Sequence, residues 1–91
     1  MPITLIVSHE VADFNTWKAA FDSHAEARSS AGFSQVNVFQ DEDNDKRVTI
    51  IGQVPSREDV LAFFGKEENK AVMQNAGVTT PPQLQFLKNS N

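Results

Sequence analysis

Two segments of the chain carry apolar side chains at both odd and even positions. Residues 3–9 (ITLIVSH) and 47–54 (RVTIIGQV) are rich in β-branched residues and show no helical spacing, so both predict β-strands. A strand that is apolar on both faces is usually central in its sheet. Residues 33–40 mix polar and apolar side chains as an edge strand does, and residues 83–87 (QLQFL) predict a short final strand.

Helical spacing fills the segment between the first two strands. Six positions recur at alternating intervals of three and four residues, as positions on one face of an α-helix do. They are Phe14, Trp17, Phe21, His24, Arg28 and Ala31. Asp13 precedes this stripe and can cap the first turn with a side-chain oxygen. Gly32 follows it, where a glycine commonly ends a helix. The pattern predicts one helix over 14–31.

A second helical region follows the third strand. Ser56 and Asp59 have the spacing of a capping box, which starts this helix at residue 56. Gly65 is expected to break or kink it, residues 66–76 to continue it, and Gly77 to end it. The inward positions of the continuation are Val72, Met73 and Ala76.

The order of the elements is therefore β-α-β-β-α-β in a chain of 91 residues, which is the length of one domain. Crossovers between parallel strands are right-handed. With two such crossovers, the strand order 4-1-3-2 puts the first and third strands in the middle, in agreement with their apolar faces. We predict an α+β, ferredoxin-like fold with a four-stranded antiparallel sheet, a single domain over residues 1–88 and a frayed tail at 89–91.

Two helices can cover only one face of such a sheet. The other face is expected to carry Ile6, Ile51, Leu87 and one or both of Phe33 and Phe39. An apolar patch of that size is large for the surface of a monomer. We expect a homodimer in which two sheets pack face to face about a two-fold axis, forming a dimeric α/β barrel.

Charge and composition exclude several kinds of partner and chemistry. The net charge is −4 and the eight lysine and arginine residues are scattered, which argues against nucleic-acid and anionic-membrane partners. The chain has no cysteine, no long apolar run, and an opening (MPITLIVSHE) unlike a signal peptide, so we expect a cytoplasmic protein. It also lacks the G-x-S-x-G, P-loop and G-x-G-x-x-G motifs of serine hydrolases, NTPases and dinucleotide enzymes.

His24 is the candidate catalytic residue. It lies on the apolar stripe between Phe21 and Arg28, and histidine can give or take a proton near neutral pH. Facing a cavity between helix and sheet, it would act as general acid or base toward a bound ligand. The alternative is a core histidine that is hydrogen-bonded to the backbone or to a neighbouring side chain.

Five further residues are candidates for ligand binding: Trp17, Phe21, Arg28, Phe64 and His9. The aromatic rings could line a pocket for a flat ligand or belong simply to the core. Arg28 on a buried stripe needs an acidic partner or an anionic ligand, unless it extends to solvent at the helix end. His9 closes the first strand, where it could face a ligand together with His24 or make a structural hydrogen bond near Asp13.

No metal site or cofactor is expected, because the histidines and acids show no spacing specific for metal ligands. Asp41, Asp43 and Asp45 resemble the start of a calcium loop. However, Lys46 stands where that loop requires glycine, and no glutamate occupies its twelfth position. We predict a solvated hairpin tip over this run.

Several of these residues form a pattern that resembles a known family. It runs His9-x-Val11-x-Asp13-Phe14-x-x-Trp17-Lys18-x-x-Phe21-Asp22, then Arg28-x-x-x-Gly32, then Ala76-Gly77-Val78 with a proline pair before Leu84-x-Phe86-Leu87. This pattern is similar to small bacterial dimeric α/β-barrel proteins labelled "cyclase-like", distant relatives of the antibiotic biosynthesis monooxygenases. The resemblance covers nearly the whole chain and implies the ferredoxin-like fold and the face-to-face homodimer.

The active members of that wider superfamily include cofactor-free oxygenases, haem-degrading enzymes, isomerases and dechlorinating enzymes. Haem-degrading members resemble one another in an Asn on the first strand and a Trp and a His in the second half. Here that strand has no Asn and no His follows His24, so haem is not expected. The sequence thus predicts a homodimeric small-molecule-binding protein, working without a cofactor as an oxygenase, cyclase or isomerase on a small apolar or aromatic ligand. The alternative is a non-catalytic sensor or an assembly or interaction module with no ligand cavity.

Overall fold

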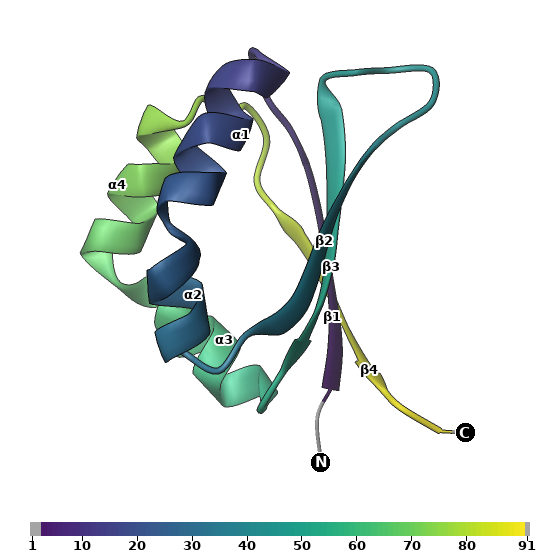
Figure 1. Cartoon of the computed structure of the whole chain (residues 1–91), viewed down its shortest axis with the longest axis vertical. Helices are drawn as coiled ribbons and strands as arrows, with labels where there is room; N and C mark the ends of the chain where they lie inside the picture. Colours follow the sequence, from purple (N-terminus) through teal and green to yellow (C-terminus); the bar gives the residue numbers. More distant parts are fainter. Residues whose placement is uncertain (1–2, 91) are drawn as a thin grey trace.

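The computed structural model describes residues 3–90, which form a four-stranded sheet with a helical layer on one side (Figure 1). Its elements in chain order are β1 (Ile3–Glu10), α1 (Phe14–Ser23), α2 (Ala25–Ser30), β2 (Ser34–Gln40), β3 (Arg47–Val54), α3 (Arg57–Gly65), α4 (Glu67–Asn75) and β4 (Gln83–Lys88). Each predicted strand is present, within one residue of its expected bounds. The helices within residues 3–90 are too short or too polar to traverse a lipid bilayer.

The strands lie in the order β2-β3-β1-β4, and each neighbouring pair is antiparallel. This is the predicted order 4-1-3-2 read from the other edge, so the ferredoxin-like fold is confirmed. The sequence pattern follows from these places. The central strands β1 and β3 have neighbours on both sides, whereas the edge strands β2 and β4 carry more exposed side chains.

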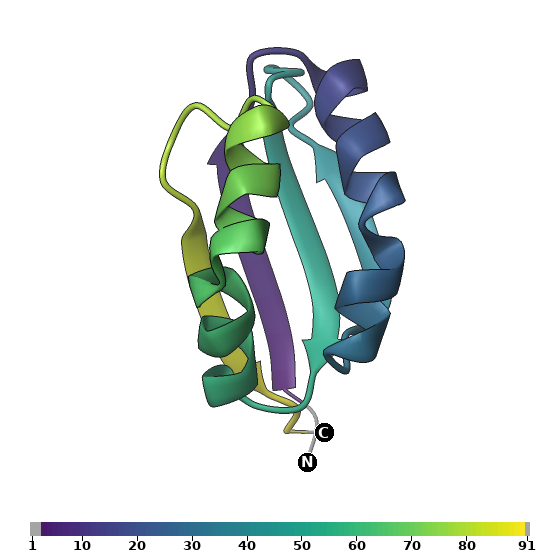
Figure 2. The ribbon, with the colours of Figure 1, turned by 90° about the vertical axis from the view of Figure 1, so that its left-hand side faces the viewer.

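The face of the sheet toward the helices holds the core. Alternate residues of β1 point to this face, and Leu5, Val7 and His9 are buried there. The adjacent strand β3 contributes Val48 and Val54. Figure 2 shows α1 and α2 along one side of this face and α3 and α4 along the other. The core is therefore enclosed between the sheet and two helical pairs.

The first helical region is not the single helix over 14–31 that the spacing predicted. It breaks at His24, where the backbone (φ −98°, ψ 14°) departs from α-helical geometry. In a continuous helix the carbonyl of Phe21 would accept the N–H of Ala25. Here it accepts the N–H of His24 at 3.2 Å and Nη1 of Arg28 at 2.7 Å. The spacing of apolar residues does not reveal this break, because the side chains of His24 and Arg28 still point toward the sheet, as they would from one continuous helix.

The predicted helix ends are confirmed at several places. Asp13 caps α1 and Ser56 caps α3, each by accepting the backbone N–H three residues later. The second helical region is interrupted directly after Gly65, as expected. Gly77 (φ +85°) ends α4, and the N–H of the following Val78 turns back to bond the last turn of the helix, as in a Schellman motif.

The opposite face of the sheet is open (Figure 1). The large apolar residues on it are Ile6, Phe39, Ile51 and Leu87, as predicted. Of these, Phe39 is 51% and Leu87 38% exposed. Phe33, which the sequence also allowed on this face, lies in the core instead, with its ring centroid 5.0 Å from that of Phe63.

A β-bulge explains the position of Phe33. The pairing of β2 with β3 shifts by one residue between Ser34 and Asn37, and Gln35 within the bulge has a positive φ of 51°. Strict alternation from Asn37 would turn residue 33 to the open face. The extra residue instead turns Ser34 to that face and Phe33 to the helices, because each inserted residue reverses the side-chain alternation.

Two polar segments lie at the ends of the sheet. Residues 41–46, between β2 and β3, are exposed as expected for a hairpin tip. In the segment predicted to fray, Asn89 accepts a hydrogen bond from Thr4 at 2.8 Å and donates one to Gln53 at 3.2 Å. Asn91, also in that segment, lies outside the described residues.

Candidate functional site

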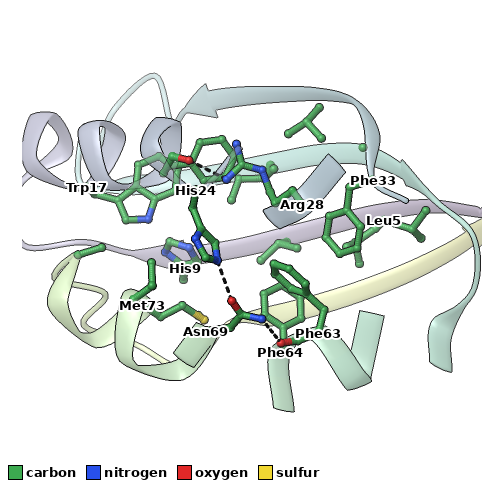
Figure 3. Close-up of a pocket in the computed structure, with 18 residues that line it drawn as sticks. Leu5, His9, Trp17, His24, Arg28, Phe33, Phe63, Phe64, Asn69 and Met73 are labelled. Carbon is green, nitrogen blue, oxygen red and sulfur yellow. Dashed lines mark hydrogen bonds between the residues drawn. The ribbon is translucent and has the colours of Figure 1, made fainter. Parts of the chain in front are cut away.

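A cavity of about 90 Å³, called the inner cavity below, lies between the helical layer and the sheet (Figure 3). All the candidate residues proposed from the sequence line it: His9, Trp17, Phe21, His24, Arg28 and Phe64. Most of the remaining lining is apolar and includes Leu5, Val7, Ile50 and Val54 from the strands. The fold thus brings together side chains from β1, from both halves of the first helical region and from α3.

His24 is held at the junction of α1 and α2 by a hydrogen bond to α4. Its Nε2 lies 2.7 Å from Oδ1 of Asn69, and Nδ2 of Asn69 donates to the backbone carbonyl of Phe63 at 2.7 Å. A carbonyl oxygen can only accept, so it orients the amide with its own oxygen toward His24. Nε2 of His24 must then carry a proton, and the neutral ring keeps its lone pair on Nδ1.

This tautomer leaves His24 able to accept a proton. Within residues 3–90 the ring hydrogen-bonds through Nε2 and not through Nδ1, and the side chain is half-buried. Oδ1 of Asn69 can accept the Nε2–H in both the neutral and the protonated ring. A base whose second nitrogen is oriented by a hydrogen-bond acceptor is the arrangement that proton-transfer catalysis requires.

Asn69 was missed by the sequence reasoning. It is 5% exposed, and its side-chain oxygen and nitrogen each make one hydrogen bond. A signal was present, because Asn69 lies on the same helix face as the inward positions three, four and seven residues later, namely Val72, Met73 and Ala76. An asparagine on an inward face needs polar partners, but the sequence does not reveal that one of them is His24.

Arg28 brings a cation to the wall of the inner cavity. Its guanidinium lies over the ring of Phe21, 3.6 Å from the centroid, and Nη1 donates to the Phe21 carbonyl. No carboxylate within residues 3–90 forms an ion pair with it. Burial lowers the pKa of Arg28, partly offset by the charge of Asp22, yet an arginine stays protonated at neutral pH. The remaining N–H groups are therefore available to an anionic group.

His9 presents an unpaired polar atom. The side chain is 3% exposed, its ring meets Trp17 edge-on at 5.6 Å, and Nδ1 is buried with no hydrogen-bond partner in the described part of the chain. Burial lowers the pKa of His9, against a smaller raising effect of the Glu10 backbone, and the charge of Arg47 lowers it further. Leaving such an atom unpaired costs about 1–3 kcal/mol.

The aromatic candidates Trp17, Phe21 and Phe64 line the inner cavity and also pack in the hydrophobic core. Trp17 and Phe21 stack with their centroids 5.0 Å apart, and Trp17 is buried. Phe64 meets Phe63 edge-on at 5.6 Å and is only partly buried. These rings give the inner cavity flat sides.

The chemistry that the site offers is acid–base chemistry in an apolar space. Its ionisable groups are the imidazoles of His9 and His24 and the guanidinium of Arg28. In the part of the chain that the structure describes, no three His, Asp or Glu side chains are grouped so that they could hold a metal ion.

No protein-family model matches the chain, and no curated protein does. Solved structures match over nearly its full length. A Bordetella bronchiseptica protein described as an antibiotic biosynthesis monooxygenase is 14% identical with a TM-score of 0.82, covering 99% of this chain and 98% of that one. A Nitrosomonas europaea protein of the same description is 15% identical with a TM-score of 0.75, covering 97% and 89%. SnoaB, a cofactor-independent oxygenase from Streptomyces nogalater, is 13% identical with a TM-score of 0.74, covering 98% and 95%.

The chain has the fold of the antibiotic biosynthesis monooxygenases. The resemblance found in the sequence is thus confirmed as a structural one. At 13–15% identity the likeness establishes the fold alone. One fold serves many reactions, so the activity has to be argued from the residues of the site.

The buried His9 gives a prediction for stability against pH. Because its pKa in the folded chain lies below the ordinary value of 6.5, the unfolded chain takes up a proton first as pH falls. The contribution of neutral, buried His9 to the free energy of unfolding is therefore fully present above pH 6.5 and is lost as the pH falls below that value. Urea unfolding between pH 8 and pH 5 should show a steeper loss for the wild type than for His9→Gln. The difference between the two proteins should stay constant above pH 7.5, and equal slopes below pH 6.5 would show that His9 is not held neutral.

Proposed function

We propose that the protein is a homodimeric, small-molecule-binding enzyme that works without a cofactor. In this proposal His24 carries a proton to and from a small apolar or aromatic ligand, as an oxygenation, a cyclisation or an isomerisation would need. The likeness to a cofactor-independent oxygenase of the same fold agrees with this kind of chemistry.

The observation that carries the proposal is the Phe63–Asn69–His24 chain of hydrogen bonds beside the inner cavity. It fixes which nitrogen of His24 is protonated and keeps Nδ1 available as a base. The inner cavity beside His24 gives a ligand a place to meet this base.

The step shared by the three reaction types is removal of a proton from an activated carbon or a hydroxyl group. Nδ1 of His24 would accept that proton, and the ligand would be left as a carbanion, enolate or phenolate. The Arg28 guanidinium has no carboxylate partner in residues 3–90 and would stabilise this negative charge. Such stabilisation is stronger in an apolar cavity than in water.

The open face of the sheet supports the homodimer. Besides its four large apolar residues it carries exposed Gln83 and Gln85 on β4 and four polar side chains that are paired within the chain. Ser8 and Thr49 lie 3.0 Å apart, and Gln53 donates to Thr4 at 2.9 Å. A second copy could therefore cover this face without leaving these groups unsatisfied.

A non-catalytic sensor or interaction module is the second candidate. The inner cavity, at about 90 Å³, is much smaller than the roughly 300–1,000 Å³ typical of ligand pockets. Under this alternative the His24–Asn69 hydrogen bond serves only to hold the helical layer together.

Proton exchange tests the catalytic role without knowledge of the natural substrate. Cyclopentanone, 1-indanone and 2-tetralone carry exchangeable protons beside a carbonyl, and their deuteration in D₂O can be followed by proton NMR. We expect the wild type to accelerate the deuteration of at least one of them. His24→Gln should lower that acceleration by about 10²–10⁴-fold, the usual contribution of a general base.

Two further variants make this result specific. Asn69→Ala should lower the acceleration less than His24→Gln, because the base remains but is no longer oriented. Lys18→Gln, at an exposed ion pair on the outer side of α1, should leave it unchanged. Exchange at the buffer rate with the wild type, or exchange that survives in a folded His24→Gln variant, would contradict the proposed function.

The homodimer is tested by mutation of the open face. Ile51 lies opposite Ile6 on the central strands of that face. Sedimentation of the wild type at micromolar concentration should give twice the chain mass of 10.1 kDa, and Ile51→Lys should give a folded monomer. Leu61→Lys, at a 51% exposed apolar residue of the helical layer, should remain dimeric. A monomeric wild type would refute the dimer.

A further inference from the structure

A second hollow adjoins the inner cavity. It has a volume of about 530 Å³ and is called the β4 groove below, since it lies between α4 and the segment that leads into β4. The apolar residues that line it are Phe64, Met73, Val78, Pro81, Pro82 and Leu84. This volume is within the range of ligand pockets, whereas that of the inner cavity is below it.

Phe64 and Met73 line both spaces and so form the wall between them. Figure 3 shows these two side chains on either side of Asn69 at the inner cavity. Both are only partly buried, and Met73 is an unbranched side chain with several rotatable bonds. Phe64 lies in the last turn of α3, directly before the break at Lys66. Of the two, Met73 is the more adaptable, because Phe64 also packs against the core cluster of Leu5, Val7, Val54 and Val60.

We propose that the ligand occupies both spaces, with a polar head in the inner cavity and an apolar body that passes between Phe64 and Met73 into the β4 groove. The inference rests on the proposed function and assigns its ligand class, an elongated apolar molecule that ends in a hydroxyl group. Phe64 and Met73 are then the residues that determine which ligand lengths are accepted.

The polarity of the two spaces supports this orientation. The His24 imidazole and the Arg28 guanidinium line the inner cavity together with His9, so the polar head lies there. The β4 groove also has polar lining residues, namely Lys70, Gln74, Thr79 and Thr80, but six of its ten lining residues are apolar and suit an apolar body. Size leads to the same conclusion, since a cavity of roughly 150 Å³ is known to hold one benzene ring. The inner cavity alone, at about 90 Å³, takes less than one ring.

A series of 4-alkylphenols tests the proposal. Phenol, 4-ethylphenol, 4-butylphenol and 4-hexylphenol are titrated into the wild type, and binding is read from the imidazole ¹⁵N signals. The chain has two histidines, so both rings can be followed separately. We expect phenol to shift the signals of His9 and His24. We also expect affinity to rise by about two- to fourfold for each added methylene, as burial of apolar groups predicts.

Groove variants locate the alkyl chain. Pro81→Glu and Gln74→Glu each put a charge at an exposed position that lines the groove and not the inner cavity. Both should abolish the gain with chain length and lower the affinity for 4-hexylphenol far more than that for phenol. Leu61→Glu, at an exposed apolar residue outside both spaces, should retain the gain.

The failures of the two proposals are distinguishable. If phenol and its derivatives shift neither histidine, the inner cavity binds no such head, and this inference and the small-molecule function both fall. If phenol shifts both histidines but affinity is independent of chain length, or the gain persists in both groove variants, only the inference about the β4 groove is overturned.

Discussion

The hydrogen bond from Nε2 of His24 to Oδ1 of Asn69 connects the two helical pairs across the inner cavity. It can form because the first helical region turns at His24 and because α4 presents Asn69 toward the sheet. The loss of either partner would leave the other polar group at an almost apolar space, which costs about 1–3 kcal/mol. The same contact decides which nitrogen of the imidazole is protonated. Packing of the helical layer and the chemistry of the site thus depend on one bond.

The two faces of the sheet have different roles. The face under the helices is closed by apolar residues except where the helical pairs meet, and the inner cavity lies there. The open face carries paired polar side chains and four large apolar residues, the mixture expected of a surface that a second copy covers. In the proposed homodimer, the candidate site and the association surface lie on opposite faces of the sheet, so one could change without the other.

Much of this arrangement could be predicted from residue order. The central strands were identified because their apolar residues occupy both parities, and Asp13, Ser56 and Gly77 located helix ends through the local chemistry of caps. The candidate site residues could be grouped because helical spacing puts Trp17 and His24 on one stripe and the strand alternation of β1 directs His9 to the same side.

The features that could not be predicted depend on contacts between distant segments or on inserted residues. At the break at His24, the Arg28 side chain replaces a backbone donor at the carbonyl of Phe21, a contact that periodicity does not report. Phe33 changes face because the bulge in β2 adds one residue to the alternation. Asn69 acquires its role from a histidine 45 residues away in the chain, which spacing along the sequence does not report.

The protonation state of His24 tests the central claim most directly. The measurement is a long-range ¹H–¹⁵N correlation spectrum recorded with the imidazole ring of His24 neutral. We expect a single tautomer protonated on Nε2, with Nδ1 at the chemical shift of an unprotonated nitrogen. The Asn69→Ala variant should show the averaged nitrogen shifts of a ring that exchanges between tautomers. A wild-type spectrum with the proton on Nδ1, or with averaged shifts, would contradict a base that is oriented by Asn69.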